Sequence, residues 1–375
     1  MARIYFDNAA TTSLDREVLD AMMPFLTNRF GNPSSIYSYG REGRLAVESA
    51  RKSVARLLNA NPAEIFFTSG GTESSNTAIT ASVRDLGCTH ILTSALEHHA
   101  TLHTIEYLVR RGEASSSQVK LHANGHVDLE DLGRQLQASG EKCLVSLMHA
   151  NNEIGNLLDL AKAGEICRAH GAVFYSDTVQ TVGHFPFDLR RTAVDFIAGS
   201  AHKFHGPKGS GILFVREGLR ISAYIHGGSQ ERNMRAGTEN VYGIVGFAKA
   251  LELASPLMDA DSRYIRSLKQ YMLESLTRKI PGVSFNGDPL GSSLYTVLSA
   301  NFPKTLKSEM ILMNLDIHNI CASGGSACTS GVEQRSHVIA AINDNPQLVT
   351  VRFSFCKHNT REEIDWTVDK IHELI

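Results

Sequence analysis

The sequence has no paired cysteines. Its six cysteines are widely spaced, and none forms a Cys-x-x-Cys pair. This spacing argues against a disulfide framework and against a cysteine-based zinc site, and it is typical of reduced thiols in a cytoplasmic protein. We therefore expect a cytoplasmic protein without a metal site.

The sequence also lacks an excess of either charge, and it lacks long apolar runs. The 37 basic and 39 acidic residues give a net charge of -2, so nothing indicates nucleic acid or an anionic membrane as a partner. No apolar run approaches the roughly 20 residues that a membrane span requires. The N-terminus has no apolar segment of the secretory type. We expect partners other than nucleic acid and membranes.

Strand and helix patterns alternate over much of the chain, whose 375 residues suit about two domains. Strand-like apolar runs occur at 65–67, 90–93, 119–122, 144–148, 173–175, 196–198 and 212–215. Helical patterns such as 161–169 lie between them, which predicts βαβ units around a largely parallel sheet. We expect an α/β large domain over residues 14–255.

The pattern changes after Pro256. Helical and strand-like segments then predict a small α+β domain with an antiparallel sheet, built from residues 256–375 and joined by residues 1–13. Its closing helix has a capping box formed by Thr360 and Glu363.

Lys203 lies in the stretch Ser-Ala-His-Lys-Phe-His-Gly-Pro-Lys-Gly-Ser-Gly at 200–211, directly after an apolar strand-like run. Partial burial lowers the pKa of a lysine, and the neutral amine can form a Schiff base with a carbonyl. A solvated loop lysine explains this stretch equally well when it is taken alone. Ser200 and His202 offer a hydroxyl and an imidazole to an anion.

Polar groups also follow other predicted strands. The turn Ser69-Gly70-Gly71-Thr72 opens a helix, whose N–H groups and dipole suit an anion, although a tight structural turn is an equal alternative. Asp177, Gln180 and Asn152 lie at or after strand ends, where α/β sheets bind ligands. A helix N-cap is the alternative for Asp177.

Three further residues are candidates for chemistry. In the run 97–103, His99 and His103 have metal-ligand spacing but no obvious third ligand, so one histidine stacked on a ligand ring is the better functional interpretation. Cys328 lies on a Gly/Ser-rich loop over 322–331 and needs a base or a positive neighbour to become a thiolate. Arg352, in an apolar strand, suits a substrate carboxylate or an edge-strand salt bridge.

Together these segments resemble the cysteine desulfurases, which are pyridoxal-phosphate enzymes of fold type I and of the class V aminotransferases. The resemblance is strongest to the branch that supplies sulfur for iron–sulfur cluster assembly. The matching segments span nearly the whole chain in the family's order: 6–12, 31–35, 67–73, 151–155, 200–203, 235–240, 325–330 and 351–354. Thr178 and Gly324 depart from the family's usual alanine and serine.

The resemblance implies roles for individual residues. Lys203 would hold pyridoxal 5'-phosphate covalently, Asp177 would pair with its ring nitrogen, and His98 would stack on the ring and transfer protons. The remaining cofactor-binding residues would be Gly71, Thr72, Asn152, Gln180, Ser200, His202 and, from a partner subunit, Thr238. Arg352 would bind the substrate carboxylate, helped by Asn32 and Asn152.

The resemblance also implies a reaction, in which L-cysteine yields L-alanine and leaves its sulfur on Cys328 as a persulfide. A homodimer would then pass the sulfur to an acceptor protein such as an iron–sulfur scaffold. Two alternatives stay open: a related enzyme, such as a selenocysteine lyase or an aminotransferase, and a catalytically idle binding protein. Cys328 argues against an aminotransferase, and the presence of Lys203, Asp177 and His98 argues against an idle protein.

Overall fold

The computed structural model describes residues 3–324, 336–343 and 345–375. Seven strands form one sheet in the order β2-β8-β7-β6-β5-β3-β4. Neighbouring strands are parallel except at β8, which is antiparallel to both β2 and β7. The strands are β2 (Ile65–Thr68), β3 (His90–Thr93), β4 (Ser115–Gln118), β5 (Cys143–Ser146), β6 (Val173–Asp177), β7 (Phe196–Ser200) and β8 (Gly211–Val215). The predicted mainly parallel, seven-stranded α/β fold is confirmed.

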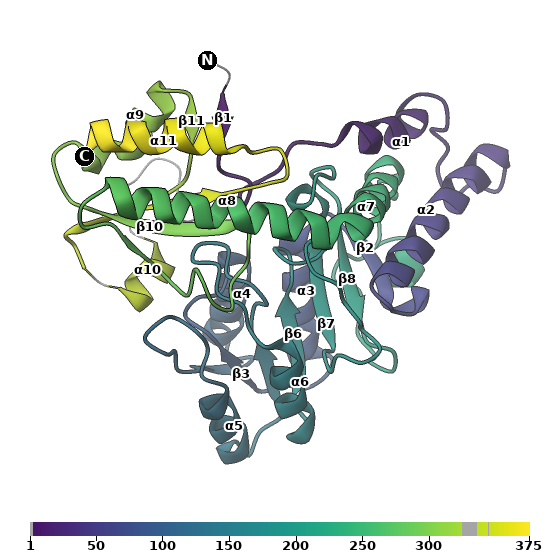
Figure 1. Cartoon of the computed structure of the whole chain (residues 1–375). Coiled ribbons are helices and arrows are strands. Elements are labelled where there is room, and N and C mark those ends of the chain that lie inside the picture. The colour runs from purple at the N-terminus through teal and green to yellow at the C-terminus, as the bar shows by residue number, and fades with distance from the viewer. Residues whose placement is uncertain (1–2, 325–335, 344) are drawn as a thin grey trace.

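Helices cover both faces of this sheet (Figure 1). Because side chains alternate along a strand, Leu144 packs with the helices on one face and Val145 with those on the other. Both faces are buried, which explains why the central strands are apolar throughout. One face carries α3 (Gly71–Arg84) and α4 (His99–Arg110). The other carries α1 (Arg16–Thr27), α2 (Ser38–Leu57), α5 (Leu129–Ala138), α6 (Leu160–Ala169) and α7 (Val241–Ala254).

The C-terminal part forms a second core around a three-stranded antiparallel sheet, ordered β12-β10-β9. Ile4 and Phe6 belong to this core, and β1 pairs in parallel with β11. The elements are β1 (Ile4–Tyr5), α8 (Met258–Lys279), β9 (Ser284–Phe285), β10 (Val297–Pro303), α9 (Ile311–Ile317), β11 (Ile320–Cys321), α10 (His337–Ile342), β12 (Leu348–Ser354) and α11 (Arg361–Leu374). The capping box of α11 is confirmed. The domain boundaries at 14 and 255 stay a prediction.

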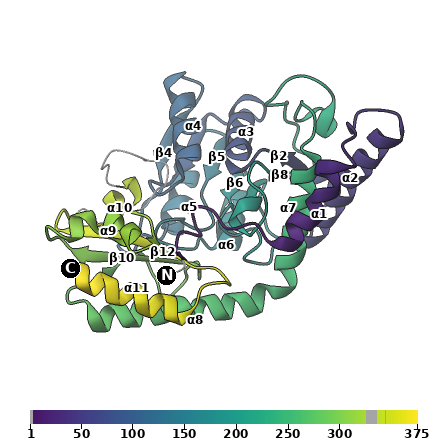
Figure 2. The same ribbon diagram turned by 90° about the horizontal axis from the view of Figure 1, so that it is seen from above.

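A nearly continuous helical stretch connects the two cores. It spans Val241–Lys279 and is long and apolar enough to cross a membrane by length and composition alone. Its first part, α7, contributes Ile244, Phe247 and Leu251 to the core beneath the large sheet. Its second part, α8, packs along α11 (Figure 2). Both parts of this stretch therefore bury apolar side chains within the protein, while Tyr242, Leu257 and Tyr264 are exposed.

One predicted strand is misplaced. The expected strand at 119–122 lies just beyond β4, and only an isolated bridge joins Leu121 to Val127. The strand itself has the polar sequence Ser-Ser-Ser-Gln, because it lies at the sheet edge and pairs with β3 alone. An edge strand with exposed side chains does not need the apolar pattern by which the central strands were found.

Candidate active site

A cavity of about 230 Å³ lies at the carboxyl ends of the parallel strands. The structure brings ten of the predicted site residues to its wall: Gly71, Thr72, His98, Asn152, Asp177, Gln180, Ser200, His202, Lys203 and Arg352. Ala9, Ala10 and Met148 also line it. These residues come from segments more than 300 positions apart, so their convergence is a property of the fold.

The amine of Lys203 is held by main-chain carbonyl groups. Lys203 ends a single 3-10 turn, Ala201–Lys203, that follows β7 directly. Its Nζ donates to the carbonyl oxygens of Ala9 at 2.5 Å and Ala10 at 2.9 Å. Gln180 Nε2 donates to the same Ala9 oxygen at 3.0 Å. The N-terminal segment therefore fixes the position of the lysine at the cavity wall.

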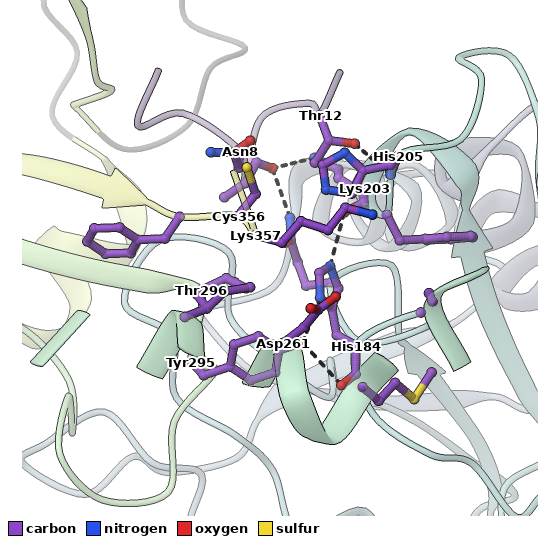
Figure 3. A pocket seen from close by; sticks show the side chains of 18 of the residues that line it. Asn8, Thr12, His184, Lys203, His205, Asp261, Tyr295, Thr296, Cys356 and Lys357 are labelled. Atoms are coloured by element: carbon purple, nitrogen blue, oxygen red, sulfur yellow. Dashed lines mark hydrogen bonds between the residues drawn. The ribbon is translucent and has the colours of Figure 1, made fainter. Parts of the chain in front are cut away.

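Lys203 is also held through its carbonyl group by a half-buried histidine, His184, that the sequence did not reveal. His184 Nε2 donates to the Lys203 carbonyl oxygen at 3.0 Å, and its Nδ1 lies 2.9 Å from the Tyr295 hydroxyl (Figure 3). Burial lowers the pKa of His184, which keeps the ring neutral. A lone histidine after a turn carries no sequence signal for this role.

Asp177 places a carboxylate at the end of β6. Its Oδ1 accepts a hydrogen bond from the Val179 backbone N–H at 2.9 Å. Burial raises the pKa of the carboxyl group, and the nearby His98 and Lys203 only partly oppose this effect. A desolvated carboxylate of this kind gains strongly from a cationic partner in the cavity. A protonated ring nitrogen would be such a partner.

His98 presents a neutral imidazole in a fixed tautomer. It is the N-cap of α4, and its Nδ1 accepts the Ala100 backbone N–H at 3.1 Å. The ring proton therefore sits on Nε2. Burial lowers the pKa of His98 further below its usual range. A neutral ring with one defined N–H group suits stacking and directed proton transfer.

The N-terminus of α3 forms an anion cradle. Gly70 precedes the helix at φ 152° and ψ -175°, a conformation open essentially to glycine alone, and it makes no side-chain cap. The first N–H groups of the helix thus keep the positive end of its dipole exposed to the cavity. Ser200 and His202 lie on the same wall, and burial beside two lysines lowers the pKa of His202 to about 4.

Arg352 makes a salt bridge, one of the two alternatives considered for it, and its role toward a substrate carboxylate stays a prediction. It lines the cavity from β12, and its side chain is buried. One terminal nitrogen donates to Asp7 Oδ1 at 2.7 Å and the other to the Asn152 carbonyl oxygen at 2.9 Å. Its buried Nε has no partner among the described residues. Asp7 was missed, although an acidic residue in an apolar segment is a signal for a buried basic partner.

Two predicted site residues lie away from the cavity, and a third is outside the described residues. Asn32 is exposed, and its Oδ1 accepts the Ser34 backbone N–H at 2.9 Å. Thr238 is exposed on the segment after the Arg235–Glu73 ion pair. Cys328 lies outside the described residues.

The rings of the histidine run pack against one another at a tilt. The ring centroids of His99 and His103 lie 4.9 Å apart, and that of His337 of α10 lies 4.5 Å from His99. Within the described residues, the one group with metal-ligand geometry does not include them. Thr178 also lies off the cavity wall, because its hydroxyl donates to the Ala198 carbonyl oxygen at 2.8 Å. That departure from the family pattern leaves the wall unchanged.

The donor set fits pyridoxal 5'-phosphate. A lysine amine can anchor an aldehyde, a buried carboxylate can pair with a ring N–H, and a helix N-terminus can hold a phosphate dianion. All three groups, Lys203, Asp177 and the turn at Gly71, line one cavity. The cavity therefore offers a partner for the aldehyde, the ring nitrogen and the phosphate of such a cofactor.

The family model for class-V aminotransferases matches residues 4–366. The chain belongs to the class V aminotransferase family. It is therefore a pyridoxal-phosphate-dependent enzyme, and the predicted family and cofactor are confirmed.

Relatives with full-length similarity narrow the family further. A cysteine desulfurase IscS of Dictyoglomus turgidum is 42% identical over 99% of this chain and 94% of its own length. One of Methanosarcina thermophila is 40% identical over 99% and 92%. A solved NifS-like protein has a TM-score of 0.91 at 36% identity, covering 99% and 98% of the two chains. A solved structure of SspA in complex with cysteine has a TM-score of 0.82 at 28% identity, covering 95% and 100%.

Proposed function

We propose that this enzyme is a cysteine desulfurase that takes sulfur from L-cysteine and releases L-alanine. The observation that carries this function is the convergence of Lys203, Asp177, His98 and Arg352 on one cavity. The relatives named cysteine desulfurase, which match almost the whole chain, agree with it. The individual residue roles below are part of the proposal.

Pyridoxal phosphate, when bound, supplies a ring that withdraws electrons from the substrate's α-carbon. Asp177 would hold the ring nitrogen in its protonated form, and the α3 N-terminus with Ser200 and His202 would hold the phosphate. Lys203 would anchor the cofactor and carry the α-proton, since two carbonyl groups already aim its Nζ at the cavity wall. The Nε2–H group of His98 would supply a hydrogen-bond donor on the same wall.

Arg352 would bind the substrate carboxylate. Its two terminal nitrogens are occupied by Asp7 and by the Asn152 carbonyl oxygen, while its Nε has no partner among the described residues. A substrate carboxylate would therefore use the Nε proton or share the terminal nitrogens. A buried guanidinium gains from a second anion because one carboxylate leaves several of its five N–H donors unsatisfied.

The sulfur step would use Cys328 as the nucleophile. Its thiolate would attack the sulfur of the bound cysteine, so that an S–S bond forms and the C–S bond breaks. The electron pair of the broken bond stays with the carbon, which takes up a proton and becomes the methyl group of alanine. The enzyme is left with a persulfide on Cys328, and the overall reaction needs no external oxidant.

The experiment that tests this function measures alanine and sulfide from L-cysteine in the presence of a thiol reductant. Cys328→Ala should abolish sulfide release while keeping the yellow cofactor, and Lys203→Ala should lose the borohydride-reducible cofactor link. Cys321→Ala is the matched control, because Cys321 lies in β11 away from the cavity. Mass spectrometry should find one added sulfur on Cys328 after exposure to cysteine. Sulfide production by Cys328→Ala at the wild-type rate would refute the nucleophile.

We also propose a homodimer in the cytoplasm that passes sulfur to an acceptor protein such as an iron–sulfur scaffold. Exposed apolar side chains gather near Asn32, namely Phe30, Ile36, Tyr37, Tyr39 and Leu45, and they support a subunit interface. Thr238 would then reach the cavity of the partner subunit. The five described cysteines are free thiols, in keeping with a reducing compartment.

Light scattering tests the dimer directly. Ile36→Asp should shift the mass toward the monomer, whereas Leu306→Asp, at an equally exposed leucine far along the chain, should not. A wild-type monomer at micromolar concentration would refute the interface. For the acceptor, transfer of radioactive sulfur from loaded enzyme to a purified scaffold protein is the measurement, with a cysteine-free scaffold as the control.

A further inference from the structure

A second, smaller cavity, of about 40 Å³, adjoins the rear of the cofactor lysine. Lys203 and Ala9 belong to the walls of both cavities. The rest of this second wall includes Asp15, His205, Asp261 and Lys357, and most of them are seen around the cavity in Figure 3. It is therefore an ionic environment that the desulfurase chemistry does not use.

Three side chains beside this cavity converge in the manner of metal ligands. Asp15 Oδ1 lies 3.9 Å from His205 Nδ1 and 3.7 Å from His358 Nε2. The three ligand atoms all lie within 4.8 Å of one another, and the rings of His205 and His358 meet edge to face at 5.3 Å. The residues come from the start of α1, the loop after Lys203 and the loop between β12 and α11.

We propose that Asp15, His205 and His358 form a binding site for a divalent transition metal ion such as Zn²⁺. Two imidazoles and one carboxylate are a ligand set that zinc accepts. Zinc–nitrogen and zinc–oxygen bonds of about 2.0–2.1 Å place tetrahedral ligand atoms about 3.3 Å apart. The distances of 3.7 and 3.9 Å to Asp15 Oδ1 therefore need to contract by about 0.4–0.6 Å, and the two histidine nitrogens, which lie within 4.8 Å of each other, by up to about 1.5 Å.

The carboxylate of Asp15 is oriented toward this site. Asp15 is the N-cap of α1, a position at which an aspartate normally accepts N–H groups of its own helix, yet its side chain makes no cap. Lys357 Nζ donates to Oδ2 at 2.7 Å, so this ion pair uses the other oxygen and leaves Oδ1 to face the histidines. The carboxylate of Asp261 lines the same cavity.

His205 is placed by a strained backbone. Its φ of 64° is uncommon for a residue with a side chain, and it is held there because its N–H donates to Thr12 Oγ1 at 2.8 Å. The Asp15 backbone N–H donates to the His205 carbonyl oxygen at 3.0 Å, which ties two ligands together. The ring Nδ1 donates to the Ser13 carbonyl oxygen at 3.0 Å.

Metal binding at Nδ1 would move the ring proton to Nε2 without any net loss of a proton. The Ser13 carbonyl oxygen would then be released beside the metal and could serve as a fourth, oxygen ligand. His358 gives access from solvent, since its side chain is 57% exposed while those of Asp15 and His205 are 17% and 10% exposed. The site thus has three side-chain ligands, a further oxygen and an entry path.

The ion would tie the start of α1 and the loop between β12 and α11 to the loop that follows Lys203. His205 follows Lys203 by two residues, and none of the three ligands lines the cofactor cavity. The role of the metal is therefore structural, and it stabilises the folded enzyme by binding to the folded state alone. This inference does not depend on the proposed desulfurase reaction.

The test is metal binding by the purified, chelator-treated holoenzyme in the absence of cysteine. Zn²⁺ is titrated against a competing chromophoric chelator, and bound metal is counted after gel filtration. His358→Ala removes a largely exposed ligand with little risk to folding, and His372→Ala is the matched exposed-histidine control. Loss of a ligand should raise the Kd for Zn²⁺ at this site by about 100-fold or more, since even the loss of a residue that only hydrogen-bonds to a ligand lowers metal affinity about 10–100-fold.

We expect the wild type and His372→Ala each to bind one equivalent of Zn²⁺. His358→Ala and Asp15→Asn should lack this equivalent. Saturating Zn²⁺ should raise the Tm of the wild type and leave that of His358→Ala unchanged. Zn²⁺ that binds to cysteine thiols or to the cofactor is the same in all variants. It therefore cancels when the bound Zn²⁺ of two variants is compared. Equal stoichiometry and Kd in the wild type and His358→Ala, or no bound equivalent in the wild type, would overturn the proposal.

Discussion

The buried ion pair between Arg51 and Glu231 gives a sharp test of how the segment before Thr238 is fixed. The two side chains are 2% and 3% exposed, and two parallel hydrogen bonds of 2.8 Å join them. Glu231 also accepts the Phe67 backbone N–H at 2.8 Å, on strand β2. Replacing Glu231 by glutamine keeps the shape of the side chain but removes the buried carboxylate. The Arg51 charge then keeps as an anionic partner the half-exposed Glu48, whose Oε1 lies 3.1 Å from Arg51 Nε.

Glu231→Gln should lower the free energy of unfolding by about 3–5 kcal/mol, the range observed when one partner of a buried ion pair is removed. The assay is urea denaturation followed by far-UV circular dichroism, at a saturating cofactor concentration. Arg51→Met combined with Glu231→Leu should recover much of the loss, because an apolar pair leaves no buried charge. Arg16→Ala, which breaks an exposed pair with Asp20, should cost under about 1 kcal/mol. If Glu231→Gln lost no more than that surface control, the reasoning about burial would be wrong.

Three other changes test the cofactor cavity and the cores. Gly70→Ala should lower the free energy of unfolding by about 1–3 kcal/mol, because φ is 152° at this position. The same change should raise the Kd of the cofactor. An unchanged Kd in cofactor titrations would contradict the anion cradle. Burial raises the pKa of Glu97 from 4.5 to about 8. The contribution of Glu97 to the free energy of unfolding should therefore be complete below pH 4.5 and decline as pH rises toward 8. Glu97→Gln should flatten that decline in pH-dependent urea melts, and an unchanged slope would count against it. Burial lowers the pKa of Lys269 from 10.5 to about 7, so the folded state favours the neutral amine. The contribution of Lys269 to the free energy of unfolding should therefore fall as pH drops from 10.5 to 7. Lys269→Met should remove this loss in the same urea melts.

The sequence was most informative where the strand pattern placed a polar residue at a strand end. Asp177 and Ser200 end adjacent parallel strands, so the topology alone brings them to one edge of the sheet. The turn at Gly71 is brought there for the same reason, because β2 ends where α3 begins. Such positions can be predicted because the period of the strands and the direction of parallel pairing leave few alternatives.

Contacts made by main-chain groups were not predictable in this way. Lys203 is held by the carbonyl oxygens of Ala9 and Ala10, and every residue has such a group, so no residue type marks the position. The proximity of Asp15 to His358 depends on two loops whose paths no periodic pattern describes. The strand Ser115–Gln118 was missed because its edge position removes the apolar signal.

The N-terminal segment 7–15 explains how these parts act on one lysine. Asp7 holds the guanidinium of Arg352, and the carbonyl groups of Ala9 and Ala10 hold the Lys203 amine. Thr12 donates through its backbone N–H and its hydroxyl to the His202 carbonyl oxygen, and the same hydroxyl accepts the His205 N–H. One short segment therefore sets the distance between the predicted substrate anchor and the cofactor lysine. A metal ion at Asp15 would fix the far end of that segment, so that its near end keeps Arg352 and Lys203 in register without entering the reaction.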